Sequence, residues 1–215
     1  GPVMERTPNH RRLIPILSLA LGWLFPGAVL AVEEPSYQVV ERHDGFELRQ
    51  YDEVVLAETL VEADFEDAGS EAFRRLFGYI SGKNRMQAKI DMTAPVVQEP
   101  ASAKIAMTAP VVQRSDATGW RVAFVVPSKY SWHDAPEPVD SRVSLRLVPE
   151  RTVAVVQFSG TWAAKRWAAM ETELREALDK AGFEPEGPAV YARYDPPFKP
   201  WFLRRNEIQI PVRAE

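Results

Sequence analysis

Cysteine is absent from this chain of 215 residues, and histidine occurs only three times. Without cysteine the chain has no disulfide, thiolate metal centre, cysteine nucleophile or thioether-linked cofactor. The histidines, His10, His43 and His133, are too few and too scattered to indicate a zinc centre. A basic excess is also missing, because the net charge is −4. This argues against nucleic acid as a partner, since a surface that binds phosphates needs positive charge.

Glycine is scarce relative to proline, with 11 glycines against 18 prolines. This ratio favours extended segments with stiff connections over a helical bundle. The content of 46% hydrophobic and 26% charged residues is typical of a globular chain, and the length favours one domain. The sequence contains no nucleophile motif, phosphate-binding glycine loop or metal triad, so binding is favoured over catalysis.

The first 31 residues have the layout of a secretory signal peptide. Arg11 and Arg12 precede an apolar run, and Val29-Leu30-Ala31 ends the segment with small residues at the cleavage positions. We therefore expect residues 1–31 to be a signal peptide that is removed after Ala31, and the protein to be periplasmic or secreted. Residues 1–3, which precede Met4, are interpreted as the remnant of an expression tag.

Two alternatives stay open for this segment. Residues 13–32 are long enough to act as an uncleaved membrane anchor, in which case the protein would be held at a membrane. The second alternative is that the same residues form a helix buried in the protein. Pro26 and Gly27, close to the exit, favour cleavage over a straight spanning helix.

Hydrophobic periodicity predicts an α+β fold for the rest of the chain. Helical spacing predicts helices over 66–81 and 162–181, each followed by a glycine, and the first includes Phe73 and Phe77 in its apolar stripe. Strands are predicted over 37–42, 46–51, 54–61, 120–126, 143–148, 152–158, 188–194 and 206–212. In 46–51 the strict alternation predicts one buried face and one solvated face.

Both predicted helices lie between hairpin-rich segments, which excludes a doubly wound parallel sheet. We expect a twisted antiparallel sheet or distorted open β-barrel with two packed helices, built from pseudo-duplicated halves.

One ten-residue segment occurs twice. Residues 89–98 and 104–113 are identical at nine of ten positions. Two copies are too few for a solenoid, so we expect the copies to pair as antiparallel strands. Pro95 and Pro110 would then lie at an edge or a bulge, because proline donates no hydrogen bond to a ladder.

This doubled Lys-Ile-x-Met-Thr-Ala-Pro-Val-Val segment resembles the SOUL haem-binding proteins. The opening hairpin 37–51, the helix end 77–84 and the closing segment 201–208 are similar to the same family, and the resemblance covers residues 35–213 as one domain. It implies a sheet or distorted barrel with two helices. It also implies non-covalent binding of haem or a related tetrapyrrole, with no assigned reaction and no fixed axial ligand.

Two histidines are candidate haem ligands, because a neutral imidazole binds haem iron. His43 lies in the turn between the first two strands and is the candidate metal ligand. His133 lies in an aromatic loop. For each, an ordinary solvent-exposed turn or loop histidine is the competing interpretation.

Aromatic and basic residues supply the remaining candidates. Arg204 and Arg205 are candidates for the haem propionates, because arginine binds carboxylates bidentately. At most one of them is expected to face a ligand, since adjacent strand residues point to opposite sides. Lys83, Arg85 and Arg193 are weaker candidates of the same type. The aromatic candidates, which would form an apolar wall for the macrocycle or pack in the core, are Tyr130, Trp132, Phe198, Trp201 and Phe202.

The expected function is to buffer or carry haem outside the cytoplasm. A module that holds a different hydrophobic ligand or a protein partner on the same scaffold is the first alternative. An enzyme acting on a tetrapyrrole is the second.

Overall fold

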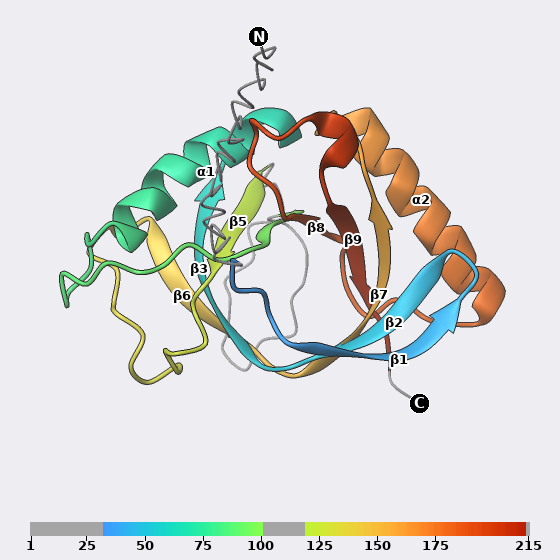
Figure 1. The fold of residues 1–215 in the computed structure, drawn as a ribbon, viewed down its shortest axis with the longest axis horizontal. Coiled ribbons are helices and arrows are strands. Elements are labelled where there is room, and N and C mark those ends of the chain that lie inside the picture. The colour runs from blue at the N-terminus through green and yellow to red at the C-terminus, as the bar shows by residue number, and fades with distance from the viewer. Residues whose placement is uncertain (1–31, 101–118, 214–215) are drawn as a thin grey trace, which may run out of the picture. The chain divides into compact units, whose positions relative to one another are not determined.

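A computed structural model describes residues 32–100 and 119–213 (Figure 1). These residues form nine strands, two α-helices and one short 3-10 helix. The strands are β1 Tyr37–His43, β2 Phe46–Tyr51, β3 Val54–Val61, β4 Val96–Pro100, β5 Trp120–Val125, β6 Val143–Val148, β7 Arg151–Phe158, β8 Val190–Arg193 and β9 Asn206–Pro211. The helices are α1 Phe65–Ile80, α2 Ala164–Ala181 and η1 Trp201–Leu203. Neither α-helix combines the length and the apolar composition that crossing a membrane requires.

All nine described strands belong to one antiparallel sheet, in the order β1-β2-β7-β9-β8-β4-β5-β3-β6. The sheet curls into a half-barrel, and α1 and α2 pack on its outer side (Figure 1). The predicted α+β fold, an open antiparallel barrel with two packed helices, is confirmed.

The two halves of the sheet repeat one topology. In β3-α1-β4-β5 and in β7-α2-β8-β9, the first strand pairs with the last and the last pairs with the middle one. The halves meet where β4 pairs with β8. The predicted duplication is therefore present as a strand, a helix and a hairpin, with β1, β2 and β6 added at the two ends of the sheet.

Each helix buries one stripe of side chains against the sheet. On α2 the stripe is Trp167, Met170, Leu174 and Leu178, as helical spacing predicts. The helix ends at Gly182, whose φ of 81° is readily adopted only by glycine. Both predicted helices therefore match the observed ones closely.

The stripe of α1 differs from the prediction at two positions. Small residues such as Ala68 and Ala72 take the fully buried places, whereas Phe73 and Phe77 are exposed and stack on each other with ring centres 5.6 Å apart. The face of α1 that contacts the sheet is taken by Ala68, Ala72 and Leu76, which are fully buried. The two phenylalanines lie beside this face. Including Phe73 and Phe77 in the buried stripe was wrong.

The predicted pairing between the two copies of the repeat is also wrong for the strand part of the first copy. Val96, Val97 and Gln98 of β4 pair with β5 on one side and with β8 on the other. Both edges of the backbone are therefore used at these three residues. That second copy lies outside the described residues.

Truncating Ile90, in the first copy, should destabilise the fold. The side chain is 5% exposed and packs in the core beneath α1, so Ile90→Ala should cost about 2–5 kcal/mol of unfolding free energy. Urea denaturation measures this loss. Met92→Ala is the matched control, because Met92 lies two residues away and is 46% exposed. A loss below about 0.5 kcal/mol for Ile90→Ala would show that the segment is not anchored in the core.

Candidate functional site

The face of the sheet that points away from the helices, called here the inner face, carries charged side chains. In β9, Ile208 and Ile210 pack in the core beneath α2, while the alternate residues Glu207 and Gln209 point to the inner face. In β2, Arg49 likewise lies on the inner face and is buried. The polar face of 46–51 was predicted to be solvated, which is wrong for Arg49, because the curled sheet covers it and a carboxylate pairs with it.

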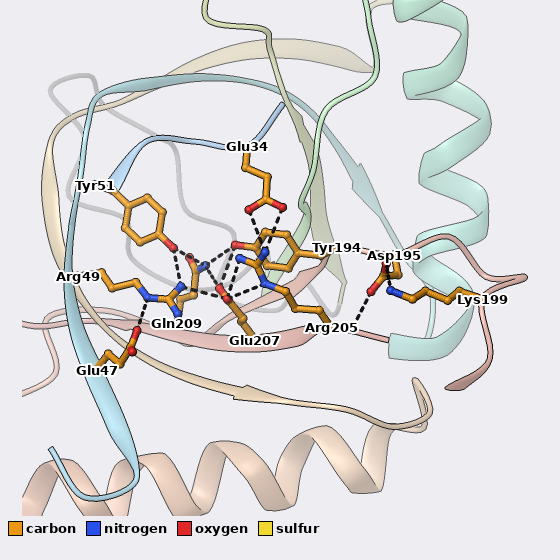
Figure 2. A network of polar contacts seen from close by, with 10 residues as sticks. All are labelled: Glu34, Glu47, Arg49, Tyr51, Tyr194, Asp195, Lys199, Arg205, Glu207 and Gln209. Atoms are coloured by element: carbon orange, nitrogen blue, oxygen red, sulfur yellow. Dashed lines mark hydrogen bonds and ion pairs between the residues drawn. The ribbon is translucent and has the colours of Figure 1, made fainter. Parts of the chain in front are cut away.

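Glu207 is the centre of the first inner-face network (Figure 2). Its carboxylate is 0% exposed and accepts hydrogen bonds from Arg49 Nη1 at 3.0 Å and from Arg205 at 3.2 Å. The Tyr194 hydroxyl donates to its other oxygen at 2.9 Å. Burial, and then the charge of Glu207, raises the pKa of Tyr194, so the phenol stays a neutral donor at neutral pH. One carboxylate on β9 thus joins Arg49 of β2 with Tyr194 and Arg205 of the segment between β8 and β9.

Arg205 was predicted as a haem-propionate ligand, and the structure shows its guanidinium already occupied. It donates to both oxygens of Glu34 at 3.0 and 3.1 Å, in addition to Glu207. It also lies 3.7 Å from the centre of the Tyr194 ring (Figure 2). An incoming carboxylate would have to displace one of these two anions.

A second inner-face network is equally self-contained. Arg146 donates to Glu58 Oε2 at 2.6 Å and to Glu99, and all three side chains are buried. Arg121 Nε lies 3.4 Å from the other oxygen of Glu58. Because the charges in both networks are paired, we interpret them as structural rather than as an open anion site.

A different region exposes apolar surface. The aromatic loop, residues 196–203 between β8 and β9, presents Phe198 at 87% exposure and Trp201, Phe202 and Leu203 at more than half. Scattered apolar residues are common on surfaces, but a contiguous group marks an interaction site.

Hydrogen bonds hold this loop against the start of α2. Gly160 N donates to Trp201 O at 3.1 Å, and Arg204 donates to Lys199 O at 2.8 Å and to Pro197 O at 2.6 Å. The Arg204 guanidinium also lies 4.5 Å from the centre of the Trp162 ring. Arg204 therefore shapes the aromatic loop, while Arg205 points to the inner face. The expectation that the two would point to opposite sides agrees with this geometry.

His43 lies at the other end of α2. Its ring stacks on Phe46 with centres 4.7 Å apart, and its Nε2 is 2.8 Å from Glu41 Oε2. A groove of about 480 Å³ runs from His43 to Ala177 and Lys180, near the end of the helix. Since the 18 residues of α2 span about 27 Å, the structure does not bring His43 together with the aromatic loop.

Tyr130 and Trp132 line a third region of the surface, a cleft of about 370 Å³. Its other walls include the acidic residues Glu33, Glu34, Asp52 and Glu53. His133 is exposed in the same loop. No aromatic contact among the described residues joins this cleft to the aromatic loop. The predicted wall of five aromatic side chains is therefore divided between two loops.

Arg193, a weaker candidate from the sequence, lies close to the aromatic loop. Its guanidinium is surrounded by the rings of Phe65, Trp162 and Trp167, whose centres are 5.1, 5.2 and 5.7 Å away. The sequence did not single out Phe65 or Trp162 as site residues, because they come from α1 and from the entry to α2. No local pattern links them to the end of β8.

The described residues form a small α+β domain, a half-barrel sheet with two outer helices and an exposed surface of aromatic and basic residues. The family model of the SOUL heme-binding protein matches residues 32–211, so the chain belongs to this family.

Curated relatives agree with this assignment. Heme-binding protein 2 of Homo sapiens is 30% identical over 195 residues, covering 84% of this chain and 90% of that protein. Heme-binding protein 1 of Xenopus tropicalis is 30% identical over 166 residues, covering 76% of this chain and 81% of that protein.

Among solved structures, the C-terminal domain of EcmrR superposes with a TM-score of 0.52 and 14% identity, covering 83% of this chain and 99% of that domain. An uncharacterized conserved protein from Listeria innocua gives a TM-score of 0.52 and 13% identity, covering 78% of this chain and 92% of that chain. At these identities the likeness shows the fold alone.

Proposed function

We propose that this protein binds haem, or a related tetrapyrrole, on the aromatic loop, and that it buffers or carries haem outside the cytoplasm. The observation that carries the proposal is the exposed group Phe198, Trp201 and Phe202. Its neighbours Arg204 and Arg193 are basic, in a chain with a net charge of −4. A flat apolar macrocycle with carboxylate side chains matches such a surface in shape and charge.

Family membership supports this ligand, since the relatives are named for heme binding. Attachment would be non-covalent, because the chain has no cysteine for a thioether bond. Binding without catalysis is proposed, because the sequence has no nucleophile motif and the described residues hold no cluster of metal-ligating side chains. His43 stays a prediction as an iron ligand, which would then require a second haem position at the far end of α2.

Trp201→Ala should weaken haem binding at least tenfold, about 1.4 kcal/mol. The reason is the apolar area that the indole contributes, at roughly 25 cal/mol per Å² buried. Trp132→Ala is the matched control, because Trp132 is also exposed but belongs to the other loop. Its affinity, like that of His43→Ala and His133→Ala, should stay close to wild type.

Haem titration followed in the Soret band measures these affinities, with circular dichroism confirming that each variant is folded. Equal losses for Trp201→Ala and Trp132→Ala, or a loss confined to one histidine variant, would contradict the proposed location.

Export is proposed from the signal-like composition of residues 1–31. Protein isolated from its native host should begin at Val32, which its intact mass would reveal. A mass that retains residues 4–31, in protein found in the membrane fraction, would instead show an anchor.

The second candidate function is an interaction module for another hydrophobic ligand or a protein. The exposed pair Phe73 and Phe77 on α1 favours it, because it adds apolar surface on a different element. Phe77→Ala should leave haem affinity unchanged if the aromatic loop is the haem site. A large loss would move the site to α1.

A further inference from the structure

Arg193, the last residue of β8, is a partly buried cation that pairs with no anion in the part of the chain that the structure describes. Its Nε and Nη2 atoms are buried and make no hydrogen bond, and no ion pair joins it to any described residue. Arg49, Arg146 and Arg205, by contrast, each pair with carboxylates. The three rings around Arg193 compensate part of its charge by cation–π interaction, which is weaker than pairing with an anion.

The structure makes room for this guanidinium. A Cβ at position 69 would lie 2.7 Å from Arg193 Nη1, so glycine in the first half of α1 leaves that space open. Glycine in a helix interior is less favourable than alanine, because it loses more backbone entropy on folding. Gly69, a less favourable helix residue, therefore lies where α1 passes the guanidinium of Arg193.

Glu66 of α1 and Glu171 of α2, on the two helices that carry Phe65 and Trp167, each make other contacts. Glu66 accepts the Ala164 N–H at 3.0 Å, and Glu171 pairs with Arg175 and Tyr191. Burial lowers the pKa of Arg193 to about 10, which still leaves it charged at neutral pH. A buried charge that lacks a partner is costly, and an anion from outside the chain would remove that cost.

Arg193 is also well placed beside the aromatic loop. Its guanidinium and that of Arg204 lie against the same indole ring, that of Trp162, at 5.2 and 4.5 Å from the ring centre. Arg204 donates to two carbonyls of the loop, whereas Nε and Nη2 of Arg193 have no hydrogen-bond partner among the described residues. The residue as a whole keeps partial solvent exposure, although its Nε and Nη2 atoms are buried.

We propose that Arg193 is the principal receptor for a ligand carboxylate at the aromatic loop, in place of Arg204 and Arg205; this rests on the proposed function. The ligand class is a planar apolar molecule with at least one acidic side chain. One propionate of a tetrapyrrole would pair with the guanidinium, while the macrocycle covers the exposed aromatic side chains.

The test compares haem with haem dimethyl ester, in which both propionates are esterified. Wild-type protein should bind haem at least tenfold more tightly than the diester. Arg193→Met should lose that preference, binding haem about tenfold more weakly and the diester within twofold of wild type. Arg193→Lys should be intermediate, because it keeps the charge but loses the planar fork. Arg166→Met, which removes an exposed cation near the start of α2, should behave as wild type.

The outcomes distinguish a failure of the proposed function from a failure of the proposed role of Arg193. Wild-type protein that binds neither porphyrin overturns the proposed function and this inference with it. Wild-type protein that binds haem and its diester equally, or an Arg193→Met variant that loses both ligands to the same extent, overturns the role of Arg193 alone. The wild-type comparison involves no substitution, so it holds even if Arg193→Met does not fold.

Discussion

Replacing Glu207 with glutamine is expected to lower the free energy of unfolding by about 3–5 kcal/mol, the range for breaking a buried ion pair from one side. The carboxylate is fully buried and serves both Arg49 and Arg205. A neutral amide keeps the shape but leaves two guanidiniums without their shared anion. Removing a partner from a buried pair is far more damaging than losing a surface pair, because the remaining charge is desolvated.

The matched control is Glu47→Gln. Glu47 pairs with the same Arg49, at 3.0 Å, but its side chain is 31% exposed, so the loss should stay below about 1 kcal/mol. Denaturant unfolding of both variants gives the comparison. Equal losses would contradict the view that the Glu207 network holds the inner face together.

Trp167→Ala should produce a loss of similar size, about 3–5 kcal/mol. Trp167 is almost fully buried beneath α2, and its ring contacts Phe65, Phe158 and Tyr191 with centres 5.0–5.9 Å apart. The truncation leaves a large cavity between α2 and the sheet, and it removes one ring from the surroundings of Arg193.

Trp167→Phe tests whether the contribution of Trp167 to stability comes from the packing of its ring or from its polar N–H group. The buried indole Nε1 makes no hydrogen bond to any described residue, so phenylalanine loses no polar contact seen there and should change stability by only about 1 kcal/mol. Thermal or urea unfolding measures both variants. A Trp167→Phe variant as unstable as Trp167→Ala would show that the indole makes a polar contact the structure lacks.

Much of the fold followed from local patterns in the sequence. Helical spacing located α1 and α2, and the glycine at position 182 marked the end of α2, because these features depend on residues close together in the chain. Strand partners depend on residues far apart. The two strands that pair with β4 are formed by residues 120–125 and 190–193. The similarity between residues 89–98 and 104–113 indicated neither of these partners.

The candidate site was predictable only in part. Alternation along an extended chain anticipated that Arg204 and Arg205 would diverge. It could not show that Glu34, far earlier in the chain, already pairs with Arg205. The polar residues of β2 and β9 alternate as solvated strand residues do, and only the curl of the sheet buries them. Likewise, the rings around Arg193 come from α1, from α2 and from the segment just before α2, so no short stretch of sequence contains them together.

Haem binding by the aromatic loop is the central claim, and a titration of the wild-type protein tests it most directly. Haem added in steps to the protein, with absorbance followed in the Soret region, should give a saturable shift that ends at one equivalent. The Trp201→Ala protein, titrated in parallel, should reach saturation only at about tenfold higher free haem. A shift that grows without an end point, or one that is identical in the two proteins, would contradict the claim.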